Sequence, residues 1–64
     1  MSAGPELSSI STALGDLTSQ VTSIAERMER TDREDLAKEL FEAERALLGA
    51  GRRLSKVVDA LNPS

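Results

Sequence analysis

The 64-residue sequence contains no cysteine, histidine, tryptophan or tyrosine, and Phe41 is its single aromatic residue. Without cysteine the chain cannot form a disulfide, and without histidine and cysteine it lacks the commonest ligands of transition metals. Catalysis would then depend on hydroxyls, lysines and carboxylates held in a preorganised cleft, and a chain this short offers little concavity. Asp35, Glu39 and Glu42 are expected to be solvated. We predict no catalytic, cofactor-binding or metal-binding residue, and therefore no enzyme.

Long apolar runs and an excess of basic residues are also missing. The longest apolar run is residues 46–48, whereas a membrane-spanning helix needs about 20 apolar residues. Residues 1–6 show neither the basic region nor the apolar core of a signal peptide, so a cytoplasmic location is expected. The net charge of −3 argues against binding to nucleic acid, whose phosphates require a basic surface.

Heptad patterning dominates the first half of the chain. Apolar residues recur there in alternating steps of three and four: Leu7, Ile10, Leu14, Leu17, Val21, Ile24 and Met28. This spacing predicts a helix over about residues 5–30 that packs against another helix. Gly4 suits the N-cap, and Pro5 suits the first helical position because its missing N–H would be unpaired there anyway. Residues 1–4 are expected to be disordered.

A second heptad pattern predicts a second helix over about residues 32–61. Its apolar positions are Leu36, Leu40, Ala43, Leu47, Ala50, Leu54, Val57 and Leu61. The segment 31–34 has the form of a capping box, in which the Thr31 hydroxyl accepts from the Glu34 amide while the Glu34 carboxylate reaches back. Asn62 and Pro63 are stop signals.

The two patterns are out of phase. Continuing the first one past Met28 would place Thr31 and Asp35 in an apolar contact. One long helix remains an alternative, with Asp32 in the contact at the cost of a buried carboxylate. A turn near residues 30–32 avoids that cost, so we expect an all-α antiparallel hairpin that forms one domain over residues 5–62. The contact inside the hairpin is expected at Leu7, Ile10, Leu14, Leu17, Val21, Ile24, Leu36, Leu40, Leu47 and Leu54.

The second helix carries more apolar residues than one contact can cover, and this surplus predicts dimerisation into a four-helix bundle. The alternative is that these residues are scattered on the surface, which is common. The residues expected to contact a second copy are Phe41, Leu48, Val58, Ala43, Ala50 and Gly51. The second helix is acidic in its first half and basic over residues 45–56, which favours an antiparallel pairing of its two copies.

The patterning favours a non-enzymatic interaction protein: a homodimer that serves as adaptor, regulator or assembly factor for a larger protein. Between Leu7 and Ala25 the first helix is rich in serine and threonine, with Asp16 its only charge. That composition is also found in helices that sense lipid packing, so a membrane-surface sensor is an alternative, although aromatic residues are missing. A nucleic-acid-associated regulator is a weaker alternative, through Arg45, Arg52, Arg53 and Lys56.

In general shape the predicted hairpin resembles small bacterial helical hairpins, including those secreted by type VII systems. The predicted turn, Arg30-Thr31-Asp32-Arg33, lacks their Trp-x-Gly motif, and the chain is much shorter. No function is transferred from this resemblance. The abundance of alanine, arginine, aspartate and leucine is typical of a GC-rich bacterial source.

Overall fold

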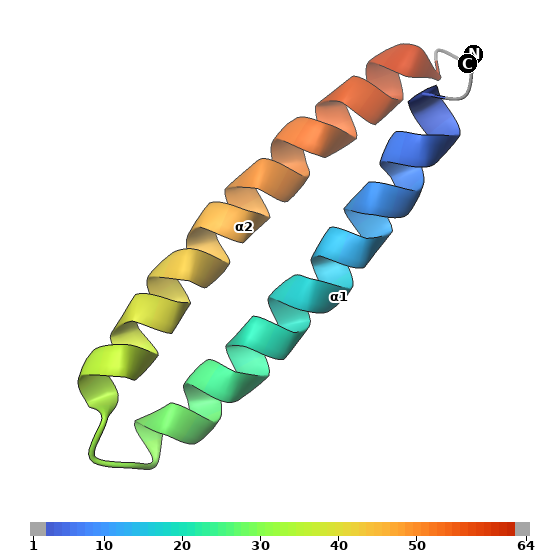
Figure 1. Cartoon of the computed structure of the whole chain (residues 1–64). Coiled ribbons are helices and arrows are strands. Elements are labelled where there is room, and N and C mark those ends of the chain that lie inside the picture. The colour runs from blue at the N-terminus through green and yellow to red at the C-terminus, as the bar shows by residue number, and fades with distance from the viewer. Residues whose placement is uncertain (1–2, 63–64) are drawn as a thin grey trace.

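A computed structural model describes residues 3–62, which form two helices joined by a short turn. Helix α1 is Ala3–Glu29 and helix α2 is Glu34–Leu61, and they lie side by side in opposite directions (Figure 1). The molecule is a rod with extents of 49 × 15 × 14 Å. The predicted all-α antiparallel hairpin is confirmed, and the alternative of one continuous helix is excluded.

The helix boundaries differ from the predicted ones by one or two residues, except at Leu61. Helix α1 begins at Ala3, so Gly4 lies inside the first turn instead of capping it. Pro5 remains compatible with this, because none of the first four N–H groups of a helix has an intrahelical partner. Of the segment expected to be disordered, residues 1 and 2 lie outside the described residues, and Ala3 and Gly4 are helical.

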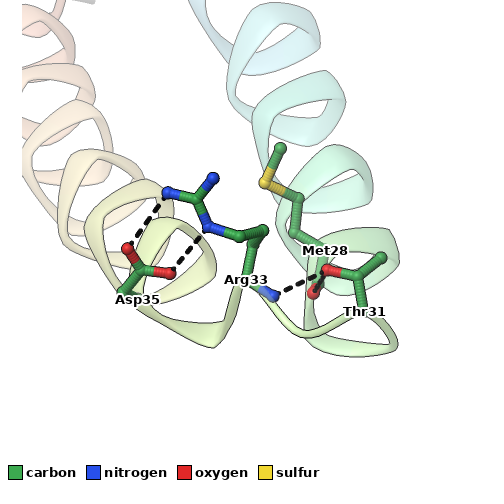
Figure 2. A network of polar contacts seen from close by, with 4 residues as sticks. All are labelled: Met28, Thr31, Arg33 and Asp35. Atoms are coloured by element: carbon green, nitrogen blue, oxygen red, sulfur yellow. Dashed lines mark hydrogen bonds and ion pairs between the residues drawn. The ribbon is translucent and has the colours of Figure 1, made fainter.

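Thr31 organises the turn between the helices. Its hydroxyl donates to the carbonyl of Met28 at 2.7 Å and accepts from the N–H of Arg33 at 3.1 Å (Figure 2). Helix α2 has Arg33 as its N-cap, without a side-chain hydrogen bond. The predicted capping box of Thr31 and Glu34 is therefore wrong, because the Thr31 hydroxyl is already engaged with the end of α1.

The turn needs no glycine. Among the described residues no backbone φ is positive, so the chain reverses in conformations that arginine, threonine and aspartate adopt without strain. The Arg33 carbonyl accepts from the N–H of Leu36 at 3.1 Å and from that of Ala37 at 3.2 Å, which starts α2. The Arg33 guanidinium donates to the Asp35 carboxylate, both N–O distances being 3.3 Å, and this holds the pKa of Asp35 below its ordinary value.

Replacing Thr31 by alanine is expected to lower the free energy of unfolding by about 1 kcal/mol, because two hydrogen bonds of the turn are lost. The control is Thr31→Ser, which keeps the hydroxyl and should stay close to the wild type. Urea unfolding followed by circular dichroism at one protein concentration measures both. Equal losses for alanine and serine would show that the hydroxyl does not hold the turn.

Mostly small residues form the line along which the helices touch. This contact line consists of buried or half-buried residues that repeat every seven positions: Gly4, Ser11, Thr18 and Ala25 on α1, and Ala37, Glu44, Gly51 and Val58 on α2. Ala25 and Ala37 are 0% and 1% exposed. A Cβ atom on Gly51 would lie 3.8 Å from Leu14 Cδ2, an ordinary contact distance, so the Leu14 side chain lies against α2 there.

Of the ten residues predicted to form the contact inside the hairpin, six are half-buried and four are exposed. Leu7, Leu14, Val21, Leu40, Leu47 and Leu54 are half-buried beside the contact line. Ile10, Leu17, Ile24 and Leu36 are exposed, contrary to the prediction. Each helix is rotated so that its small residues face the other helix, because small side chains allow a closer approach of the two backbones. Within residues 3–62 no large side chain is fully buried.

Candidate interaction surface

Large apolar side chains remain in contact with solvent along the whole rod. Seven of them are between 37% and 55% exposed: Ile10, Leu17, Ile24, Leu36, Leu48, Val57 and Leu61. Single exposed apolar residues are ordinary on a protein surface, but a contiguous apolar patch marks an interaction site. What matters is therefore whether these residues lie together.

Six of the seven lie on one side of the hairpin. On α1 the exposed residues directly precede those of the contact line, as Leu17 precedes Thr18, and on α2 Leu36 precedes Ala37 in the same way. The two helices are antiparallel, so on both of them the residue just before a contact-line residue points toward the same side of the hairpin. We call this side the front face; its outer rows are Ile10, Leu17 and Ile24 on α1, and Leu36, Ala43, Ala50 and Val57 on α2.

The front face continues inward without a polar interruption. Between the two outer rows lie half-buried apolar residues from both helices: Leu7, Leu14, Val21, Met28, Leu40, Leu47 and Leu54. Leu61, 44% exposed, extends this inner set at the end of α2. Together these rows present apolar side chains at two of every seven positions of each helix, which is the spacing of a coiled-coil seam, and the contact line occupies a further position of the heptad.

The exposed area supports the same interpretation. The chain exposes 4908 Å², whereas a compact monomer of 6.9 kDa would expose about 4,000 Å². The radius of gyration of 14.8 Å likewise exceeds the roughly 11 Å of a compact chain of this length. The excess of about 900 Å² is close to the ~800 Å² that each partner buries in a standard protein–protein interface. This excess follows from the elongated shape of the hairpin, and it is of the size that one partner surface would cover.

The opposite side of the hairpin, here called the back groove, is narrower and more polar. It is a shallow groove lined by Gly15, Thr18, Leu48 and Ser55 among others. The Thr22 hydroxyl donates to the carboxylate of Glu44 across the two helices, and the Thr18 hydroxyl donates to the Leu14 carbonyl at 2.7 Å. Leu48, 47% exposed, is the large exposed apolar residue on this side.

The residues predicted to contact a second copy are divided between different environments. Ala43 and Ala50 lie on the front face, and Leu48 lies in the back groove. Phe41 and Val58 are half-buried within the hairpin, and Gly51 lies on the contact line. Sequence reasoning placed Leu17 inside the hairpin, where the structure leaves it exposed, because it assigned the whole heptad pattern to the contact between the two helices. The small residues Thr18, Ala25 and Ala37 were the signal that could have distinguished the contact between the helices from the outer apolar side.

Charged groups do not form a second candidate site. Arg52, Arg53 and Lys56 line an open hollow beside Gly49 and Val57 near the end of α2. The ion pair of Glu42 with Arg45 spans 3.1 Å and joins two exposed side chains. Among residues 3–62 no group of three or more acidic residues is arranged to hold a metal ion. Neither described helix has the length and apolarity required to cross a membrane.

No protein-family model, curated protein or solved structure matches this chain. The front face, with its apolar rows and its surplus area, is therefore the feature from which a function is inferred.

Proposed function

We propose that this chain is a non-enzymatic oligomerisation protein, a helical hairpin that pairs with a second copy through its front face to form a four-helix bundle. The observation that supports the proposal most directly is the distribution of apolar side chains. No large side chain in residues 3–62 is fully buried, while Leu17 is 55% exposed in the middle of the front face. Covering such a face with another apolar surface is favourable in water, and large exposed apolar patches mark interaction sites.

The small stability expected of a single hairpin also supports pairing with a second copy. Isolated helices are marginal in water, and most helical stability in proteins comes from packing of an apolar face. Chains of this size rarely gain more than about 3–5 kcal/mol from one core, and this chain has no cysteine to form a disulfide. Pairing of two front faces would place the half-buried inner rows in a common core. Folding and association are then expected to be one process.

Sedimentation equilibrium at micromolar concentrations tests the proposal. The expected mass is twice the 6.9 kDa of one chain, and the thermal midpoint of the helical signal should rise with protein concentration. A cooperatively folded species with the mass of one chain and a midpoint independent of concentration would contradict the proposal. Partial dissociation on dilution, with parallel loss of helical signal, is the most direct support for coupled folding.

In this proposal the bundle serves a larger protein as adaptor, regulator or assembly factor. The faces left outside the bundle are those that point away from the front face. On α1 this outer surface is formed by exposed serine and threonine residues, among them Ser8, Ser9, Thr12, Ser19 and Ser23. An uncharged polar surface of this kind can be buried against a partner without desolvating charges.

A second candidate function, sensing of loosely packed membranes, is favoured by one observation. The front-face row of α1 is exposed and apolar, and Asp16 is the only charge on this helix between Leu7 and Ala25. Flotation with vesicles of unsaturated lipid separates the two functions. Recovery of the protein with the vesicles at the expense of the dimer supports the membrane function, whereas a dimer that stays with the dense fraction rules it out.

A further inference from the structure

We propose that the two hairpins pair antiparallel, with their turns at opposite ends of the bundle and a two-fold axis that passes between the two copies of Leu17. This inference rests on the proposed dimer and adds the geometry of the partner surface. Each α1 then faces the α1 of the second copy, and each α2 faces the other α2. Three observations carry it: the symmetry of the two front-face rows, their alignment along the rod, and the charges that border them.

The outer rows of the front face have the same pattern when followed in either direction. On α1 the row is Ile10, Leu17 and Ile24, with Leu17 at its centre. On α2 the row is large, small, small, large: Leu36, Ala43, Ala50 and Val57. A two-fold axis perpendicular to the helices requires such a pattern, because each residue meets its counterpart from the other end of the same row. Leu17 then meets Leu17 of the second copy.

The centres of the two rows lie at nearly the same height along the rod. Leu14 contacts Gly51, and Thr22 hydrogen-bonds to Glu44, so Leu17 lies level with residues 48–49 of α2. The centre of the α2 row falls between residues 46 and 47. The difference is about two residues, or about 3 Å along a helix. One axis can therefore pass close to both centres, as a single symmetry operation demands.

Charges along α2 are complementary under the same operation. Acidic residues predominate before the centre of the row, and Arg52, Arg53 and Lys56 follow it. Glu39 and Arg53 are exposed, occupy equivalent positions two heptads apart, and border the front face on α2. With the axis close to the centre of the α2 row, between residues 46 and 47, Glu39 of each copy lies next to Arg53 of the other. The acidic half of each α2 lies along the basic half of its counterpart, which lowers the electrostatic energy.

The competing arrangement places both turns at the same end. Each α1 would then face the α2 of the second copy, and Leu17 would lie diagonally across the bundle from its own counterpart. The acidic first halves of the two copies of α2 would then lie at the same end of the bundle, where Glu34, Asp35, Glu39, Glu42 and Glu44 outnumber Lys38 and Arg45. Like charges at the same end of a bundle disfavour it.

Cysteine cross-linking tests the orientation, and because the chain contains no cysteine each variant carries a single thiol. Packed helices with axes 8–10 Å apart bring facing Cα atoms to about 4–6 Å, within reach of a disulfide. Leu17→Cys should therefore convert under mild oxidation to a species of twice the 6.9 kDa mass on a non-reducing gel. Ile10→Cys alone should stay a single chain, and a mixture of Ile10→Cys with Ile24→Cys should cross-link.

The outcomes separate this inference from the proposed function. If Leu17→Cys fails to cross-link but sedimentation still gives the mass of two chains, the dimer stands and the antiparallel geometry is wrong. Cross-linking of a mixture of Ile10→Cys with Val57→Cys would then identify the arrangement with both turns at one end. If sedimentation gives the mass of one chain for the wild type, the proposed function fails, and the orientation with it.

Exchange of charge gives an independent readout that introduces no thiol. Glu39→Arg places two arginines opposite each other twice per dimer and should raise the dissociation constant about ten-fold. Adding Arg53→Glu should restore it, because the pair is then reversed in both contacts. Glu42→Arg, with the same change in net charge on the outer side of α2, is the control and should leave the dissociation constant within about two-fold. A double variant no tighter than Glu39→Arg would overturn the antiparallel pairing.

Discussion

Replacing Leu17 by aspartate is expected to abolish the dimer and, with it, most of the helical signal at micromolar concentration. Leu17 is 55% exposed in one hairpin but lies at the centre of the proposed interface. In the dimer two carboxylates would be buried against apolar surface, and each would lose its hydration without gaining a partner. A cost of about 4 kcal/mol or more per dimer corresponds to a rise of roughly 1,000-fold in the dissociation constant. Sedimentation equilibrium and circular dichroism over a concentration series measure both effects.

The control for this experiment is Leu48→Asp. Leu48 is 47% exposed, close to Leu17 in type and exposure, but it lies in the back groove. If the front face is the interface, Leu48→Asp keeps the mass of two chains. Dissociation by Leu48→Asp but not by Leu17→Asp would instead assign the interface to the residues predicted from the sequence, Phe41, Leu48 and Val58. The pair of variants therefore decides between the two sides of the hairpin.

Replacing Ala25 by leucine is expected to lower the free energy of unfolding by about 2 kcal/mol, or the thermal midpoint by roughly 10 °C. Ala25 is fully buried where α1 meets α2, and Ala37, about one helical turn away along the contact line on α2, is 1% exposed. Three added carbon atoms cannot fit there without moving the helices apart, and that movement would separate the contact line along its neighbours as well. Thermal unfolding at one protein concentration, followed by circular dichroism, measures the change.

Ser19→Leu is the control, because it introduces the same leucine at an exposed position of α1 that points away from the front face. Surface substitutions of this kind usually stay within about 0.5 kcal/mol of the wild type. If Ala25→Leu proved as stable as Ser19→Leu, the helices would not approach each other along Ala25 and Ala37. The rotation of the helices that exposes Leu17 would then have to be abandoned as well, since the small contact line is what turns the larger residues outward.

The helices themselves could be predicted from local patterning. Two uninterrupted heptad repeats with a phase break near Thr31 indicated two helices and a turn, and the structure confirms both. The same reasoning failed at the turn, where Thr31 matched a capping box but bonds to Met28 instead. A capping box and a turn stabilised by a threonine hydroxyl have similar residue spacing. Which one forms depends on where the first helix ends, and that depends on the packing of the second.

The division of the apolar residues between two contacts could not be predicted from the spacing alone. A heptad pattern states that a helix has an apolar side, but Leu14 and Leu17 fit that pattern equally well. Only the packed hairpin shows that Leu14 is half-buried and Leu17 exposed. The close approach along Thr18, Ala25 and Ala37 decides this division. It rotates each helix so that the middle of its apolar side does not point directly at the other helix.

By itself the sequence determined that this chain forms two helices of similar length and that it lacks the side chains for disulfides and the usual metal sites. Those properties are local or compositional, because helical periodicity and residue chemistry do not depend on distant contacts. Tertiary structure decided which apolar residues remain outside, since that depends on how closely two backbones approach. The front face around Leu17 exists because small residues occupy the contact line, leaving the larger ones to face a second surface.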